Sequence, residues 1–439
     1  MSDLGVKLIR LVIIVFAASL LWACEGDDGK DGAAGQAGPP GTAGPPGPPG
    51  PTGGTGGVPV DSAEKINIEI TGVTVPAGGG AAVVDLRLTN DLTQGLTGLP
   101  ASDIRFMLSQ LSPAPAAGAS SEWQSYVTRS SGGIADAQAT SETASAGTFV
   151  DYGDGTYLYT YAQALTAYPA GPTYDETKTH RMGIEIRGQA PISTNGIFDF
   201  VPAGGAPLFE HKVVDNDTCN ACHDVLNFHG GPRTDVEYCV TCHNPYSIDG
   251  DTGNTVDMKA LIHNIHVGRN GYVIIGFRGT VHDYSDVVWS QDIRNCQTCH
   301  EEDDENTPQA SNWREVPSRA ACGTCHYDDG VPGNNNDFAI EDGVHPAGLA
   351  FTDDTQCVNC HGPDATVGGG VLRVAEVHRI PEQEASLAFQ FNILSVTGTG
   401  VGETPVVQFS VTDPTNGDAP YNIQTDAPFT VCAGGASRL

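Results

Sequence analysis

The sequence of 439 residues predicts a multidomain protein. We expect an antiparallel β sandwich or barrel at 58–207, a mostly irregular, part-helical domain at 208–381, and an incomplete second β domain at 382–439. Three observations predict this order. Apolar and polar residues alternate over much of the first segment, with the two-residue period of strands. The alternation fades in the second segment, which is rich in glycine and asparagine, and it returns in the third.

The first β domain is predicted from two alternating runs and one hairpin. Apolar residues occupy every second position in the runs Ile66-Ile68-Ile70 and Met182-Ile184-Ile186. The stretch TFVDYGDGTYLYTY predicts a hairpin, with Asp154-Gly155 as a type I′ turn. No chemical motif is visible in this domain, so His180 is interpreted as a surface residue.

The third segment resembles the start of the first. Residues 387–413, LAFQFNILSVTGTGVGETPVVQFSVTD, repeat the order found in INIEITGVTVPAGGGAAVVDLRLTND from Ile66: an alternating strand, a Gly-rich connection and a second strand. This similarity predicts an internal repeat. The second copy is the shorter one.

The middle segment contains five CxxCH motifs, which is far more than chance predicts for 12 Cys and 13 His. Two thiols at i and i+3 lie on one side of a helical turn, where they can add to the vinyl groups of one haem. The following histidine then ligates the iron. Zinc sites pair CxxC motifs without requiring a histidine after each, and a redox dithiol needs one CxxC, so both alternatives are disfavoured.

The motifs therefore predict five covalent c-type haems. The thioether cysteines are Cys219, Cys222, Cys239, Cys242, Cys296, Cys299, Cys322, Cys325, Cys357 and Cys360. The proximal iron ligands are His223, His243, His300, His326 and His361.

Seven further histidines could supply second axial ligands: His211, His229, His263, His266, His282, His345 and His378. An iron with both axial positions filled cannot easily bind substrate, so electron relay is favoured over catalysis and no catalytic residue is assigned. The main alternatives are a multihaem reductase with an open haem site, and a haem-binding gene fragment without complete wiring. No CxxCK motif supports the reductase.

Spacing suggests how the second ligands are distributed. A helical stretch from His223 to His229 rises only about 9 Å, so the two can hardly hold one haem, and His229 is assigned to a neighbouring haem. The stretch DMKALIHNIHVG predicts a helix with Asp257 as N-cap and Gly268 as its stop. His263 and His266 lie three apart on one face, so we expect them to ligate two different irons.

The N-terminus predicts export and a lipid anchor. Lys7 and Arg10 precede an apolar run, and residues 1–23 read as a signal peptide. Leu21-Trp22-Ala23-Cys24 resembles a lipobox, which predicts lipidation of Cys24; the alternative is an ordinary signal cut nearby. Residues 24–57 have the collagen period, with glycine at every third position from Gly26 to Gly56. About ten triplets would form only a weak triple helix, so an extended collagen-like tether is preferred over a trimer.

Charge excludes one class of partner. A formal charge of −32 disfavours nucleic acid or an anionic membrane surface as a partner, because binding phosphate groups requires clustered Lys and Arg. The acidic turns Asp249-Gly250-Asp251 and Asp328-Asp329 could bind calcium, although solvated loops are the preferred interpretation. Cys432 is left without an assigned partner.

The order of these features resembles the N-terminal half of the decahaem outer-membrane cytochromes of the OmcA/MtrC type. CNACHDVLNFHGG, EYCVTCHNP, LIHNIHVG, QDIRNCQTCH and QCVNCHGP are similar to the pentahaem signatures of that family. The resemblance guides the choice of His345 and His378, which join His229, His263 and His266 as distal ligands, with His282 and His211 in reserve. Family members continue with a complete second β domain and a second pentahaem domain, which are missing here.

The resemblance also implies a place and a role. It implies a lipid-anchored protein on the outer face of the outer membrane. Such a protein would take electrons from a porin-cytochrome conduit or a periplasmic donor and pass them to metal oxides, flavins or similar extracellular acceptors.

Overall fold

The computed structural model describes residues 56–116, 118–188, 192–207, 211–327, 345, 351 and 353–430. The expected signal peptide, nearly all of the tether, Cys24, Cys432 and Asp328-Asp329 lie outside these ranges. In the described part of the chain, no helix is long and apolar enough to cross a bilayer.

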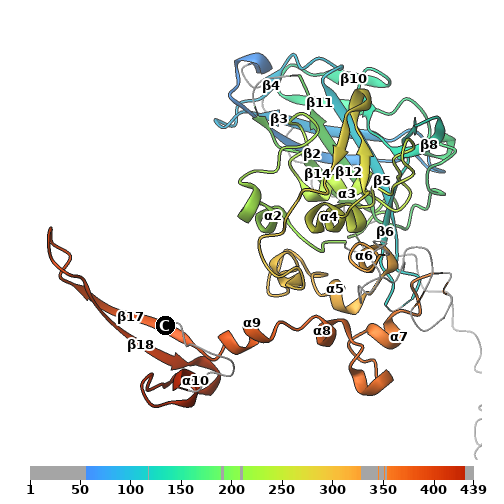
Figure 1. Ribbon diagram of the computed structural model, residues 1–439. Helices are drawn as coiled ribbons and strands as arrows, with labels where there is room; N and C mark the ends of the chain where they lie inside the picture. The colour runs from blue at the N-terminus through green and yellow to red at the C-terminus, as the bar shows by residue number, and fades with distance from the viewer. Residues whose placement is uncertain are drawn as a thin grey trace, which may run out of the picture. The chain divides into compact units, whose positions relative to one another are not determined.

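The N-terminal domain consists of two main β-sheets (Figure 1). One has the strand order β10-β11-β3-β2-β13, and the other has the order β14-β12-β5-β6, with β9 also paired to β5. The predicted antiparallel β domain is confirmed; only two short strand pairs, β1 with β4 and β13 with β2, are parallel among the described residues. The strands are β1 (Val58–Pro59), β2 (Lys65–Thr74), β3 (Val83–Thr89), β4 (Leu96–Thr97), β5 (Ile104–Ser112), β6 (Glu122–Ser125), β7 (Thr128–Ser131), β8 (Ile134–Ala139), β9 (Glu142–Thr143), β10 (Thr148–Asp151), β11 (Thr156–Thr160), β12 (His180–Ile186), β13 (Ile192–Ser193) and β14 (Gly196–Phe200).

The alternating runs build the core between these sheets. Ile66 and Ile70 on β2 and Met182, Ile184 and Ile186 on β12 belong to one buried cluster, as their period predicted. Aromatic rings join the two sheets: Phe106 of β5 stacks on Tyr159 of β11, with ring centres 4.1 Å apart. Burying such large apolar side chains is the main contribution to the stability of the domain.

The predicted hairpin forms, but its turn differs from the prediction. Strands β10 and β11 pair antiparallel, and the Tyr152 amide donates to the Thr156 carbonyl. Positive φ falls on Gly153 and Gly155, not on Asp154, so this is not the two-residue type I′ turn. The Asp154 carboxylate instead accepts from the Thr156 amide at 2.9 Å, as aspartate does in local turns.

The expectation that His180 is a surface residue is wrong. Its side chain is 0% exposed and lies in the β domain, where Nε2 is 2.9 Å from the Tyr126 hydroxyl. Burial lowers the pKa of His180 to about 4, so the ring is neutral at pH 7. His180 lies beside an alternating run, and nothing in the sequence indicates that it has a buried hydrogen-bond partner.

The second domain is part-helical and largely irregular, as predicted. Its named elements are α2 (Asn216–His223), α3 (Val236–Cys242), α4 (Met258–Val267), β15 (Val273–Ile275), β16 (Val281–Asp283), α5 (Asn312–Glu315), α6 (Arg319–Cys322), α7 (Val358–His361), α8 (Val374–Val377) and α9 (Pro381–Ser386). The predicted helix over DMKALIHNIHVG is confirmed as α4. Gly268 ends it in the left-handed conformation, and Asp257 occupies the N-cap position without a side-chain capping bond.

Helix α3 packs against the outer face of β12. All seven residues of β12 are buried, because Arg181 and Glu185, which alternation would place in solvent, face the second domain. Arg181 forms a bidentate pair with Asp199, with both N–O distances 2.7 Å, and an ion pair with Glu237 of α3 at 2.8 Å. Between these charges, Tyr238 of α3 packs so closely on Gly183 that a Cβ at Gly183 would lie 2.8 Å from the ring.

The two hairpins that the predicted internal repeat relates have the same strand register. Strands β17 (Gln390–Thr397) and β18 (Val406–Asp413) pair like β2 and β3, and a bulge follows the equivalent isoleucine in both hairpins. Equivalent pairs are Ile70 with Leu86 and Ile393 with Phe409, then Val73 with Val84 and Val396 with Val407. A short strand, β19 (Ala419–Pro420), and a helical turn, α10 (Ala427–Thr430), follow.

Replacing Arg181 with glutamine should destabilise the protein markedly. The change leaves Asp199 and Glu237 without their shared cation, and breaking a buried ion pair from one side costs about 3 kcal/mol or more of the free energy of unfolding. Urea unfolding followed by far-UV circular dichroism measures the loss. Arg87→Gln on the exposed face of β3 is the matched control and should change stability by less than about 0.5 kcal/mol. Equal losses in the two variants would contradict the account.

Candidate haem-binding sites

Each CxxCH motif forms a single helical turn or lies within a helix. The first is the C-terminal part of α2, and the second spans α3 and its C-cap, His243. In the last four motifs the histidine amide donates to the carbonyl of the first cysteine, with N–O distances of 2.9, 3.0, 2.9 and 3.0 Å. This turn brings both thiols and the imidazole to one side of the backbone, as attachment to one porphyrin requires.

Side-chain caps fix where these helices begin. The carboxylate of Asp215 accepts from the Thr218 amide ahead of the first motif, and Asp235 accepts from the Glu237 amide ahead of the second. The hydroxyl of Ser318 accepts from the Ala321 amide and begins α6, which leads into the fourth motif. None of the ten motif cysteines, all of them described, forms a disulfide.

Every motif histidine faces a second histidine from another part of the chain. These partners are the five residues proposed from the sequence as distal ligands. The pairs and their ring-centre distances are His223 with His266 at 5.9 Å, His243 with His229 at 5.9 Å, His300 with His263 at 6.4 Å, His326 with His378 at 6.1 Å, and His361 with His345 at 6.1 Å.

These distances are those of two imidazoles on opposite sides of one metal ion. A metal–imidazole bond is about 2 Å long and the ring centre lies roughly 1.2 Å behind the nitrogen, so two imidazoles bound to opposite sides of one metal would have ring centres about 6.4 Å apart. Rings stacked directly on one another would be closer. The donor set therefore fits an iron ion between each pair of histidines, with the two thiols of the motif beside it.

Backbone carbonyls fix which ring nitrogen is available. Nδ1 of His243 lies 2.9 Å from the Val256 carbonyl, and Nδ1 of His361 lies 2.8 Å from the Leu372 carbonyl. On the opposite side, Nδ1 of His266 and of His378 each lie 2.9 Å from a carbonyl one helical turn earlier. A carbonyl only accepts, so Nδ1 carries the proton and Nε2 is left to bind a metal.

Burial keeps several of these imidazoles neutral. It is the main reason that the pKa of His229 is lowered to about 3 and that of His300 to about 4. The pKa values of His243, His263, His266 and His326 are lowered for the same main reason. A neutral imidazole is the form that binds a metal, so these sites need not lose a proton at pH 7 before binding.

Helix α4 joins two of the sites. His266 faces the first motif and His263 faces the third, so two residues three apart on one helix serve different motifs. The edge of the Trp289 ring packs against His266, with ring centres 5.1 Å apart. The backbone of α4 therefore sets the spacing of the first and third sites.

The motif cysteines also show which sites are neighbours. Burial is the largest cause of the raised thiol pKa values, and a cysteine of an adjacent motif raises them further. This pattern relates Cys239 to Cys219, Cys219 to Cys299, Cys296 to Cys325 and Cys322 to Cys357. The neighbouring motifs shown in this way are the second and first, the first and third, the third and fourth, and the fourth and fifth.

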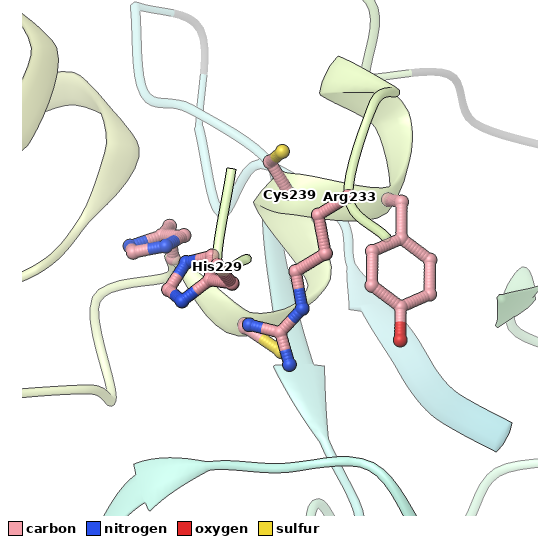
Figure 2. Close-up of a pocket in the computed structure, with 6 residues that line it drawn as sticks. His229, Arg233 and Cys239 are labelled. Carbon is pink, nitrogen blue, oxygen red and sulfur yellow. The ribbon is translucent and has the colours of Figure 1, made fainter. Parts of the chain in front are cut away.

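The second site has a pocket that can be described in detail. It is lined by His229, Arg233, Tyr238, Cys239, Cys242 and His243, and Figure 2 shows the Arg233 guanidinium among the histidine and cysteine side chains. The expected helical stretch from His223 to His229 does not form, because α2 ends at His223 and Asp224 takes φ of 60°. His229 nevertheless faces the neighbouring motif, from a loop in which its own φ is 54°.

The two histidines held in reserve as distal ligands, His211 and His282, have other partners. Nδ1 of His211 is 3.1 Å from the Ser121 hydroxyl, and the ring of His282 stacks with Tyr284. Arg233 was not selected from the sequence, since its carboxylate partner, Glu185, is far away in the chain. Sequence spacing alone does not identify an ion pair between residues this far apart in the chain.

In the acidic turn Asp249-Gly250-Asp251, hydrogen bonds from within the protein already reach both carboxylate oxygens of Asp249. The carboxylate of Asp249 is fully buried and accepts hydrogen bonds from Thr252 and from the Ile275 amide on one oxygen, and from the Asp251 amide on the other. Among the described residues, no cluster of three or more His, Cys, Asp or Glu side chains forms a candidate metal-ion site. Asp249 is therefore a residue that holds its own loop together.

Comparison with known proteins agrees with this architecture. Residues 211–379 match the family described as outer membrane cytochrome MtrC/MtrF-like, domains II/IV, and residues 76–202 match the decaheme cytochrome c component MtrC/MtrF N-terminal domain. The chain is 30% identical over 338 residues to the multiheme cytochrome MtrC of Shewanella baltica (strain OS185), which covers 74% of this chain and 43% of that protein.

Two crystal structures are similar in fold. The outer membrane decaheme cytochrome OmcA superposes with a TM-score of 0.61 and 26% identity, over 83% of this chain and 55% of OmcA. MtrC from Shewanella baltica OS185 superposes with a TM-score of 0.55 and 26% identity, over 82% of this chain and 52% of MtrC. The chain spans about half the length of these relatives. From the two family matches and these similarities, the chain belongs to the MtrC/OmcA family of outer-membrane decahaem cytochromes, in which it matches the N-terminal domain and domain II.

Proposed function

We propose that this chain binds five c-type haems and relays electrons between them. The observation that carries the proposal is that all five CxxCH histidines face a second histidine at 5.9 to 6.4 Å. A bound haem supplies reversible one-electron chemistry. The chain attaches each haem through two thioethers and holds its iron between a motif histidine and His266, His229, His263, His378 or His345, in motif order.

The same pairs favour relay over bond-making catalysis. A reductase that binds its substrate at iron needs a site with one axial position open. Here each motif histidine already has a counterpart at the separation of two trans ligands. Each motif also has at least one neighbouring motif, which a relay requires.

We further propose that the protein is a lipoprotein on the outer face of the outer membrane. The sequence at Cys24 and the membership of an outer-membrane family support this placement. A porin-cytochrome conduit or another periplasmic donor would supply electrons, and metal oxides, flavins or similar molecules would accept them.

His263→Met and His266→Met should each change a different haem. Methionine in place of an axial histidine raises the reduction potential of that iron, so each variant should move one of five components in a spectroelectrochemical titration. His282→Met, whose ring faces Tyr284, is the control and should leave all five unchanged. If both variants moved the same component, or if either moved none, the assignment of α4 to two sites would be wrong.

Cys24→Ala should convert the protein from membrane-bound to soluble. Without the cysteine there is no thiol to carry the lipid, so haem protein should leave the outer-membrane fraction. Fractionation followed by haem staining of gels measures the distribution, and Cys432→Ala is the control that should stay membrane-bound. Protease treatment of intact cells should also release haem protein from the wild type; retention in the inner membrane would contradict the placement.

A further inference from the structure

Arg233 brings a positive charge into the second haem pocket. Its side chain lines the pocket together with both thioether cysteines, Cys239 and Cys242, and both histidines of the pair (Figure 2). The side chain is only 14% exposed. An arginine cannot lose its proton in a protein, so this charge is present at every pH at which the protein is folded.

A buried carboxylate of the β domain holds Arg233 in this position. Nε of Arg233 lies 2.8 Å from Glu185 on β12, whose side chain is 0% exposed. The guanidinium also lies over the Tyr238 ring, 5.9 Å from its centre. Burial raises the pKa of Glu185, but Arg233 and Arg187 lower it by more, so the carboxylate is ionised.

Positive charge exceeds negative charge in this cluster. Glu185 also faces Nε of Arg187 at 2.8 Å and Nε of Arg105 at 4.0 Å. Three guanidinium groups against one carboxylate give an excess of two positive charges, and of these four side chains only Arg233 lines the pocket. Glu237, the nearby acid on α3, is paired with Arg181 and Lys212. Asp235, the remaining acid at the start of α3, caps that helix by accepting from the Glu237 amide at 2.8 Å.

A fixed cation beside a haem favours the reduced state. Oxidation adds a positive charge at the iron, and a neighbouring cation repels it, the more so where solvent is largely excluded. We propose, on the basis that this pocket binds a haem as argued above, that Arg233, positioned by Glu185 of the β domain, raises the reduction potential of the haem attached to Cys239 and Cys242. The β domain would then tune one site of the relay as well as supporting it.

Arg233→Gln and Arg233→Lys in the full haem-loaded chain test this role. Arg233→Gln removes the charge and should lower one of the five potentials in a spectroelectrochemical titration. The component that moves should be the one that His229→Met also moves, since both residues line the same pocket. Arg233→Lys keeps a cation and should restore most of the wild-type value. Arg87→Gln, on the exposed face of β3, is the control and should shift none.

Arg187→Gln is a second variant that still tests the proposal if Arg233→Gln fails to fold. Arg187 is 34% exposed, lies outside the pocket lining and shares Glu185, so its loss reduces the positive excess without opening the pocket. It should lower the same potential by a smaller amount. The proposal is overturned if either glutamine variant, with five haems bound, leaves that potential unchanged, raises it, or shifts all five alike. A wild-type haem count below five would instead refute the proposed function.

Discussion

The separation of five pairs of facing imidazoles, which is the separation that a shared iron would require, is the constraint on which the arrangement of the second domain depends. A conventional core cannot supply it, since this domain is built from short helices joined by irregular segments. Instead, five motif turns are each placed opposite a histidine from another segment. Backbone carbonyls accept hydrogen bonds from Nδ1 of several of these rings and thereby fix the orientation of each ring.

The β domain supports the second domain and also supplies side chains that position the second motif. The outer face of β12 alternates Arg181, Gly183 and Glu185, and each of these meets the segment that leads into or forms the second motif. Arg181 binds helix α3, Gly183 makes room for Tyr238, and Glu185 holds Arg233 in the pocket. One strand thus presents an apolar face to the sandwich and a charged face to a haem site.

Local chemistry made much of this predictable from sequence. The CxxCH spacing identifies the motif turns, Gly268 marks the end of α4, and the two-residue period identifies β2, β12 and the repeated hairpin. The predictions that failed concerned side chains whose contacts come from residues far away in the chain. His180, Arg181 and Glu185 look like surface residues until the Tyr126 hydroxyl, α3 and Arg233 are placed against them. The loop conformation of His229 was also missed, because positive φ at Asp224 ends α2 earlier than a helical period suggests.

The central claim is that five haems are bound, each between two histidines. Low-temperature electron paramagnetic resonance of the fully oxidised protein, integrated against chain concentration, tests it most directly because axial ligation sets the spin state of ferric haem. The account predicts five low-spin ferric centres per chain, one for each motif, and no high-spin signal. A high-spin signal in the native protein, or fewer than five low-spin centres per chain, would contradict it.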